Sequence, residues 1–221
     1  LVEDVEFKNL GLVVTDEQHR FGVRQRANIV SKGTNPDVLV MTATPIPRTL
    51  ALILYGDLDI SIIDELPPNR KKIETYPVTK NYERRIEEFI RSNVAQGRQA
   101  YIVCPLVEES EEFDNFTSAV ELAEKYQKVI FPEFKVTCLH GKMKQKEKDE
   151  IMEKFKNGEI QILVSTTVIE VGVNVPNANI MVVQNAEHFG LAQLHQLRGR
   201  VGRGEYQSYC ILIYEGNAKT T

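Results

Sequence analysis

Short runs of apolar residues recur along the chain, separated by longer stretches whose apolar positions repeat at helical spacing. Continuous apolar runs without polar alternation are typical of strands that are buried on both faces, as in a parallel sheet covered by helices. The runs are GLVV (11–14), VLVM (38–41), AYIVC (100–104), VTCL (136–139), ILVS (162–165) and IMVV (180–183). The sequence therefore predicts an α/β fold in which parallel sheets are flanked by helices.

Two of the intervening stretches predict helices that cover such a sheet. Residues 143–157 place Ile151, Met152 and Phe155 opposite a charged face and end at an Asn-Gly pair, which is typical of a helix C-terminus. Residues 116–130 show the same spacing at Phe116, Ala119, Val120, Ala123, Tyr126 and Ile130.

The segment ELPPNRKK at 65–72 interrupts the pattern with two prolines and a basic polar run. We therefore expect a first lobe over residues 1–65, a linker over 66–75 that acts as a hinge, and a second lobe over 76–221. The second lobe has five or six predicted strands and could fold alone. The first lobe has too few strands for a complete domain of this class, so we expect the chain to begin inside a domain.

Composition narrows the class of protein. The chain has 221 residues, of which 42% are hydrophobic and 26% are charged, and these values indicate a globular protein of one or two domains. No apolar run reaches about 18 residues and the N-terminus lacks the pattern of a signal peptide, so we expect a cytoplasmic protein without a membrane partner. Three widely spaced cysteines, Cys104, Cys138 and Cys210, indicate buried reduced thiols and no zinc site.

The net charge is also informative. A charge of −4 and a pI near 5.7 argue against a generally basic surface for nucleic acid, so a polyanion would have to meet a local patch.

Two carboxylates follow the first apolar run, in the sequence DEQH at 16–19. Thr15 and Gln18 fit a capping box, and acids are favoured in a first helical turn, so the segment could simply start a helix. Ligands also collect at the carboxyl ends of parallel strands. There, Asp16 could hold Mg²⁺ through water, and Glu17 could orient or deprotonate a water molecule that attacks a phosphate. The local sequence leaves both interpretations open.

Hydroxyl groups follow two further strand-like runs. In MTATPIPRT, Thr44 fits the N-cap of a helix and Pro45 fits its first residue. This capping role does not exclude a second role for the threonine in relaying whether a phosphate is bound. In VSTTVIEVGVNVP (164–176), hydroxyls and a glycine could touch ribose, phosphate or a nucleic-acid backbone.

The sequence QLHQLRGRVGRG at 193–204 is the most specific. Three leucines that recur every three residues predict a helix with a buried stripe, which would hold Gln196, Arg200 and Arg203 near its end. Glycine permits close approach, and guanidinium groups bind phosphate oxygens at two points, so the segment is suited to phosphate. A solvated basic loop is the alternative. The leucines are Leu191, Leu194 and Leu197.

Four of these segments resemble, in the same order, motifs II, III, V and VI of superfamily 2 helicases. They are DEQH, TAT, STTVIEVGVNVP and QLRGRVGRG. The longer segments DEQHRFGVRQR, MTATPIPRTLAL, GDLDISIIDELPP and AEHFGLAQLHQLRGRVGRG are similar to the RecG family, ATP-dependent DNA translocases that remodel stalled forks and branched DNA. This similarity runs over nearly the whole chain.

Transcription-repair coupling translocases share TATPIPRTL and QLRGRVGR but fit GDLDISIIDELPP less well. An RNA helicase and a non-catalytic binding lobe are further alternatives.

The resemblance implies a RecA-like fold of the P-loop NTPase type, with a partial first lobe and a nearly complete second lobe. It implies ATP and Mg²⁺ as cofactors, with Asp16 as the Mg²⁺-associated acid and Glu17 as the carboxylate that activates water. It also implies that Gln196, Arg200 and Arg203 face the γ-phosphate of ATP from the second lobe.

The remaining implied roles are coupling and binding. Thr42 and Thr44 would couple hydrolysis to motion, and Gly172 and Asn174 would contact the nucleotide. The family usually has Asp at the position of Asn174 and Arg at the position of His188. The implied DNA-binding residues are His140, Gly141, Lys142, Thr166 and Thr167.

The loop G-x-x-x-x-G-K-[ST], whose backbone N–H groups and lysine hold the phosphates of ATP, does not occur in this sequence. The family's wedge domain and the segment beyond motif VI are also missing. We therefore expect a motor fragment that depends on the P-loop and the N-terminal wedge of the same protein, acts on branched or double-stranded DNA, and hydrolyses little ATP alone.

Overall fold

The structure is a computed structural model that describes residues 5–16, 21–42, 59–65, 70–105, 112–166 and 174–216. The chain divides into two compact units, Leu1–Ser61 and Ile62–Thr221. Each unit is described by itself.

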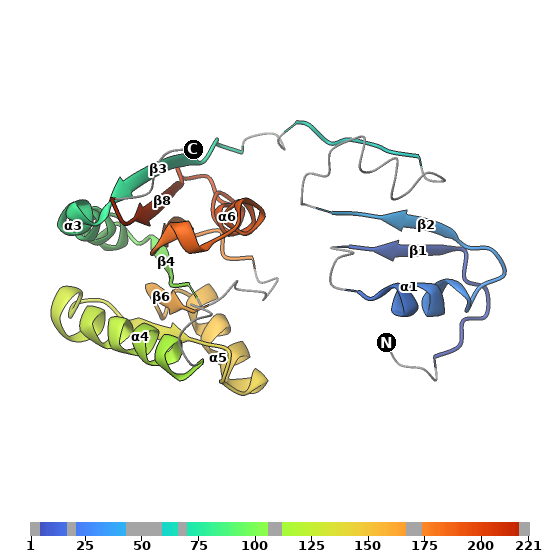
Figure 1. Cartoon of the computed structure of the whole chain (residues 1–221), viewed down its shortest axis with the longest axis horizontal. Coiled ribbons are helices and arrows are strands. Elements are labelled where there is room, and N and C mark those ends of the chain that lie inside the picture. The colour runs from blue at the N-terminus through green and yellow to red at the C-terminus, as the bar shows by residue number, and fades with distance from the viewer. Residues whose placement is uncertain are drawn as a thin grey trace. The chain divides into compact units, whose positions relative to one another are not determined.

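The first unit contains a parallel pair of strands (Figure 1). The pair consists of β1 (Leu12–Thr15) and β2 (Asp37–Val40), and α1 (Val23–Val30) connects the two strands and lies against β1. Both strands coincide within one residue with predicted runs. The parallel βαβ connection agrees with the expected α/β class.

The two strands of the first unit are not buried on both faces. Val13 is buried, but Leu12 and Val14 are 56% and 51% exposed. The prediction of two buried faces is therefore wrong for the described part of this unit. Among the described elements of this unit only the helix α1 packs against the pair, and one helix can cover only one face.

The second unit contains a sheet of six described strands in the order β3-β8-β7-β4-β6-β5, and every neighbouring pair is parallel. The central strands β4, β6 and β7 are buried along their whole length, which explains their continuous apolar sequences. The strands are β3 (Glu74–Thr79), β4 (Gln99–Val103), β5 (Val136–Leu139), β6 (Ile162–Ser165), β7 (Ala178–Val183) and β8 (Tyr209–Tyr214).

Helices cover both faces of this sheet (Figure 1). One face packs against α3 (Glu83–Ala95) and α4 (Glu112–Lys125), and α4 continues into a π-helical turn at Tyr126–Ile130. The other face packs against α5 (Gln145–Lys156) and α6 (Leu191–Arg198). The prediction of a parallel sheet flanked by helices is confirmed.

Alternation along β4 shows how the two faces are formed. Ile102 belongs to a cluster with Ile90 of α3, whereas Tyr101 belongs to a cluster with Phe155 of α5 and Leu197 of α6. Successive side chains of a strand point to opposite faces, so one apolar run supplies both clusters.

The predicted helices are also found. The helix expected at 143–157 is α5, in which Met152 and Phe155 are buried, and it ends at Asn157 followed by Gly158 with φ +78°. The helix expected at 116–130 is α4 with its π-helical turn. Its buried residues include Ala119, Ala123 and Tyr126.

The cysteines are free thiols, of which Cys104 and Cys210 are buried and Cys138 is partly exposed. Burial raises the pKa of the Cys104 thiol to about 12, so this group stays protonated and unreactive at neutral pH. Within the described ranges, the structure has no helix long and apolar enough to cross a membrane.

The C-terminal end of the predicted linker belongs to the second unit. β3 begins at Glu74, and its first two residues pair with Tyr209 and Cys210 of β8. The centre of the linker, residues 66–69, lies outside the described residues, so the hinge remains a prediction.

Candidate functional site

Asp16 and Thr42 lie at the carboxyl edge of the first unit's sheet. Asp16 directly follows β1 and Thr42 lies two residues beyond β2, and both residues are exposed. The N–H group of Met41 donates to the carbonyl of Thr15 at 2.8 Å, so the two strand ends stay side by side. The structure thus brings these two predicted residues to one edge. Their predicted neighbours Glu17 and Thr44 lie outside the described residues.

The capping interpretation of Thr15 stays a prediction, because its expected partner Gln18 lies outside the described residues. Thr15 is the last residue of β1 and pairs with Val40, and Asp16 lies in a bend. The first described helix, α1, begins at Val23, where the N–H group of Gly22 donates to Oε1 of Gln25 at 3.0 Å. The parallel pairing continues to Thr15, so Asp16 occupies a strand end.

No potential metal centre is complete in the described part of the chain. Nowhere there do three or more His, Cys, Asp or Glu side chains gather to hold an ion. A carboxylate at this strand end, such as Asp16, suits Mg²⁺ that is held largely by water and phosphate oxygens.

The residues 199–205, called the arginine segment below, lie at the amino edge of the second unit's sheet. Gly202 has φ +77°, and a Cβ atom there would lie 2.8 Å from Cγ1 of Ile73. A Cβ atom at Gly204 would lie 2.3 Å from the carbonyl oxygen of Pro176. Ile73 precedes β3 and Pro176 precedes β7, so only glycine permits these two approaches to the strand starts.

Arg203 lies between these two glycines. Its side chain is exposed, and its Nε–H group donates to the carbonyl of Gly199 at 3.3 Å. Gln196 and Arg200 are half-buried. Arg200 and Arg203 both act electrostatically on Tyr101 of β4, where they partly oppose the rise in the pKa of its hydroxyl that burial causes. The three predicted ATP-facing residues therefore share one end of α6.

The predicted leucine stripe is only partly correct. Leu197 is fully buried and Leu194 is partly buried, but Leu191 is 79% exposed. A repeat of three residues falls short of a helical turn by about 60° at each step. Leu191 therefore points well away from the direction of Leu197, and Leu197 alone gives α6 a deep anchor.

The predicted DNA-facing residues lie at the opposite, carboxyl edge of the same sheet. His140 follows β5 and Thr166 follows β6, and the N–H group of Thr166 donates to the carbonyl of Leu139 at 3.4 Å. Gly141 and Lys142 are exposed in the next turn. The structure therefore separates these residues from the arginine segment by the length of the sheet. Thr167 and Gly172 lie outside the described residues.

Burial affects two residues of this edge. Thr166 is only 3% exposed, so its side chain has little surface to offer to a ligand. The pKa of His140 is lowered, first by burial and then by the positive charge of Lys148, whereas Glu147 opposes this effect. His140 is therefore a neutral imidazole at neutral pH, which can form hydrogen bonds but lacks the charge that attracts phosphate.

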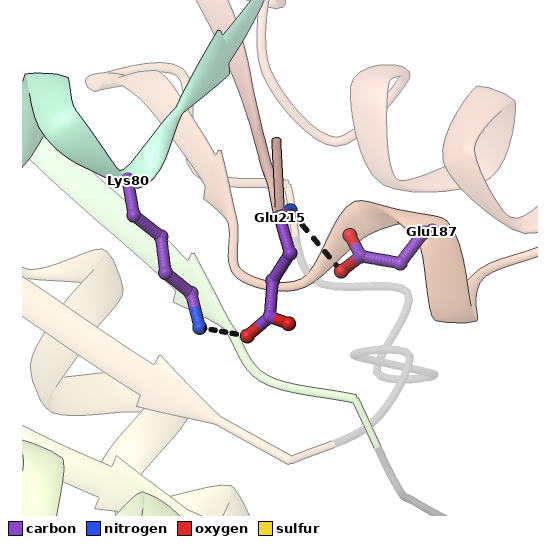
Figure 2. A network of polar contacts seen from close by, with 3 residues as sticks. All are labelled: Lys80, Glu187 and Glu215. Carbon is purple, nitrogen blue, oxygen red and sulfur yellow. Dashed lines mark hydrogen bonds and ion pairs between the residues drawn. The ribbon is translucent and has the colours of Figure 1, made fainter. Parts of the chain in front are cut away.

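A network of polar contacts lies at the same carboxyl edge, just after β3 and β8. Figure 2 shows Lys80, Glu215 and Glu187: the ammonium of Lys80 pairs with Glu215, whose backbone N–H group donates to Oε1 of Glu187 at 3.2 Å. Lys80 also lines a pocket of about 330 Å³ together with Glu83 and Glu87. Glu215 pairs with Lys80 and is held in turn by Glu187, so the network joins the chain after β3 to the chain after β8.

Comparison with known proteins identifies this arrangement. Residues 81–205 match the model of the helicase conserved C-terminal domain. The chain belongs to this helicase family. It is 57% identical over 211 residues to the ATP-dependent DNA helicase RecG of Thermotoga maritima, covering 96% of this chain and 27% of that protein. It is 55% identical over 218 residues to RecG of Bacillus subtilis, covering 99% and 32%. The chain thus spans about three tenths of the length of these relatives.

Solved structures agree with this assignment. A structure of RecG bound to a three-way DNA junction matches with a TM-score of 0.75 and 51% identity, over 96% of this chain and 27% of that one. The helicase Lhr of Mycobacterium smegmatis, bound to ssDNA and AMP-PNP, matches with a TM-score of 0.66 at 17% identity over 93% of this chain and 28% of that one, which shows the fold alone. The resemblance to RecG and the RecA-like fold class are confirmed.

Sequence reasoning missed Arg98 and Tyr206, whose side chains contact each other directly after the arginine segment of this helicase domain. Arg98 lies over the ring of Tyr206, the second residue after Gly204, and also donates to Oδ1 of Asn177 at 3.2 Å. Asn177 in turn donates to the carbonyl of Gly97 at 2.6 Å. The aromatic residue so close to the last glycine was the available signal, but its partner lies more than a hundred residues earlier.

Proposed function

We propose that this chain is part of an ATP-dependent DNA helicase and translocase that remodels branched DNA and stalled replication forks in recombination and repair. The observation that carries the proposal is the position of Arg203. This exposed residue lies between two glycines whose neighbours, Ile73 and Pro176, leave no room for a side chain. The chain that contains it is 57% identical to RecG of Thermotoga maritima. A rigid segment that presents an exposed guanidinium is suited to a phosphate that changes charge during reaction.

In this proposal the arginine segment completes an ATP site. Arg200, Arg203 and Gln196 would face the γ-phosphate of ATP held by a P-loop elsewhere in the same protein. Phosphoryl transfer depends mainly on positioning and on electrostatic stabilisation, which fixed arginines supply. Asp16 would hold Mg²⁺ through water, and Glu17 would orient the attacking water molecule.

The other predicted residues would couple this site to DNA. Thr42 and Thr44 would relay the state of the phosphate, and Gly172 and Asn174 would contact the nucleotide. Because Thr166 as a whole residue is only 3% exposed, it would act mainly by holding the end of β6 beside the exposed residues that follow β5. The DNA-facing residues would be His140, Gly141, Lys142, Thr166 and Thr167.

The separation of these residues in the second unit fits a motor. The residues predicted to face ATP lie at the amino edge of the sheet, and those predicted to face DNA lie at its carboxyl edge. Movement of the unit about the predicted linker at 66–75 would then displace the DNA contacts when ATP is bound or released. Three free thiols fit a reducing compartment, and we infer a cytoplasmic location.

The test uses the complete protein. ATP turnover is measured without DNA, with linear duplex DNA, with a three-way junction and with single-stranded RNA, and strand exchange at a model fork is followed by gel. We expect the junction to stimulate turnover most and the fork to be remodelled only with ATP. Glu17→Gln is the matched control, because it removes the charge at constant shape and should abolish turnover while DNA binding remains. Stimulation by RNA alone, or turnover indifferent to DNA, would overturn the proposal.

A further inference from the structure

Residues that precede β3 are bonded directly to the arginine segment. The Nε–H group of Arg70 donates to the carbonyl oxygen of Gly202 at 3.0 Å, in a half-buried position. The side chain of Ile73 packs against the same glycine, and the amide of Gln207 donates to the carbonyl of Lys72 at 2.9 Å. Three contacts therefore tie residues 70–73 to the chain on both sides of Arg203, two at Gly202 and one at Gln207.

These contacts differ from those on the far side of Arg203. Gly204 lies against Pro176, directly before the central strand β7. Gly202 lies instead against Arg70 and Ile73, which belong to the C-terminal part of the predicted linker. The backbone of Arg203 is thus fixed between the body of the unit on one side and the incoming chain on the other. A displacement of the incoming chain would reach Arg203 through Gly202 on one side and through Gln207 on the other.

We propose that Arg70 is a positioning residue, which makes the placement of Arg203 depend on the chain that enters the second unit. The hydrogen bond from Arg70 holds the carbonyl of Gly202, so a displacement of the chain around Arg70 would shift the backbone of Arg203. Small misplacements of a catalytic group are costly, since about 1 Å can lower a rate by up to 10²-fold. The inference rests on the proposed function.

The experiment is a double-mutant cycle on the complete protein, with ATP turnover measured at saturating junction DNA. Arg70→Ala should lower kcat at least about fivefold with little change in the KM for ATP, since it removes positioning and no contact with the nucleotide. Arg70→Lys retains an N–H donor and should recover most of the rate. Lys71→Ala, an exposed neighbour with the same charge change, should behave as wild type.

The cycle separates positioning from stability. If Arg70 acts through Arg203, then Arg70→Ala should slow the Arg203→Ala protein less than about twofold. An equal slowing in both backgrounds, or a normal rate for Arg70→Ala, would overturn the inference. If Arg70→Ala fails to fold, Ile73→Val takes its place, because it removes one methyl group beside Gly202. A wild-type protein without DNA-dependent turnover would overturn the proposed function and this inference together, whereas an active wild type with an unaffected Arg70→Ala variant would overturn this inference alone.

Discussion

The guanidinium carbon of Arg98 lies 3.0 Å from the centroid of the Tyr206 ring. Arg98 comes just before β4, and Tyr206 comes just after the arginine segment, so the stack joins the start of a central strand to the chain that leaves the segment. Positive charge over the face of an aromatic ring is stabilising, and here it is combined with the hydrogen bond from Arg98 to Asn177.

Tyr206→Ala should therefore lower the free energy of unfolding by about 1 kcal/mol, because the ring is only half exposed and its cation–π contact is lost. Tyr206→Phe keeps the aromatic face and should stay within about 0.5 kcal/mol of wild type. Urea denaturation followed by circular dichroism measures both. An equal loss in the two variants would mean that the hydroxyl, and not the ring, carries the contact.

Two leucines of α6 should differ sharply in their contribution to stability. Leu197 has no exposed surface, so Leu197→Ala should cost about 2 to 5 kcal/mol through lost burial and the cavity that remains. Leu191 is 79% exposed, and Leu191→Ala should change the free energy of unfolding by at most about 0.5 kcal/mol. Urea denaturation of both variants checks the pair, and similar costs would contradict the burial that the structure shows.

The central strands β4, β6 and β7 could be predicted from the sequence because they are apolar on both faces. β5 and β6 coincide with the predicted runs at 136–139 and 162–165. The same rule was wrong for Leu12 and Val14, because continuous apolar sequence does not show whether a second helix is present to cover the strand. Burial depends on neighbours as well as on composition.

The candidate site was predictable in its residue types but not in its contacts. Spacing and glycine content pointed to Arg203, but the contact of Arg70 with Gly202 joins residues 132 positions apart. Such contacts follow from strand order, since the starts of β3 and β7 must first be brought to one edge. Local sequence also fits a capping role for Thr15, and this interpretation stays open because Gln18 lies outside the described residues.

Gly202 and Gly158 form a matched pair for testing the close contact in the arginine segment. Their φ angles are +77° and +78°, but a Cβ atom at Gly158 would meet no atom within 4 Å, whereas a Cβ atom at Gly202 would lie 2.8 Å from Ile73. Gly158→Ala should cost about 1 to 2 kcal/mol from backbone strain alone. Gly202→Ala should cost about 1 to 3 kcal/mol more, because the methyl group also displaces Ile73. Equal unfolding free energies for the two variants would show that the segment relaxes freely.

His140 should titrate below its usual range. Burial and the charge of Lys148 lower its pKa, so an NMR titration of the imidazole should give a value below 6.5. Lys148→Met should raise this value without restoring it fully, since burial is the larger cause. The unfolded chain binds the proton near pH 6.5 and the folded chain only at lower pH. The stability linked to this residue is therefore complete above pH 6.5 and falls as the pH drops toward the folded pKa. His140→Gln should reduce that slope, and an unchanged slope would contradict the assignment.

Arg203→Ala in the complete protein should lower ATP turnover at saturating DNA by at least about a hundredfold, with the melting temperature nearly unchanged. Arginines that stabilise the transferring phosphate contribute roughly 10³ to 10⁵ in rate, so a hundredfold loss is a conservative bound. Folding should be little affected, because the side chain is exposed and its one described hydrogen bond, to the carbonyl of Gly199, is long at 3.3 Å.

Arg203→Lys is the matched control: it keeps the charge but loses the two-point geometry, and it should recover only a small part of the rate. Nucleotide affinity measured beside turnover should change much less than the rate, because the contact strengthens as charge develops during the reaction. Normal turnover of Arg203→Ala, or a loss of activity matched by a collapse of the melting temperature, would show that this arginine supports the fold and does not serve the reaction.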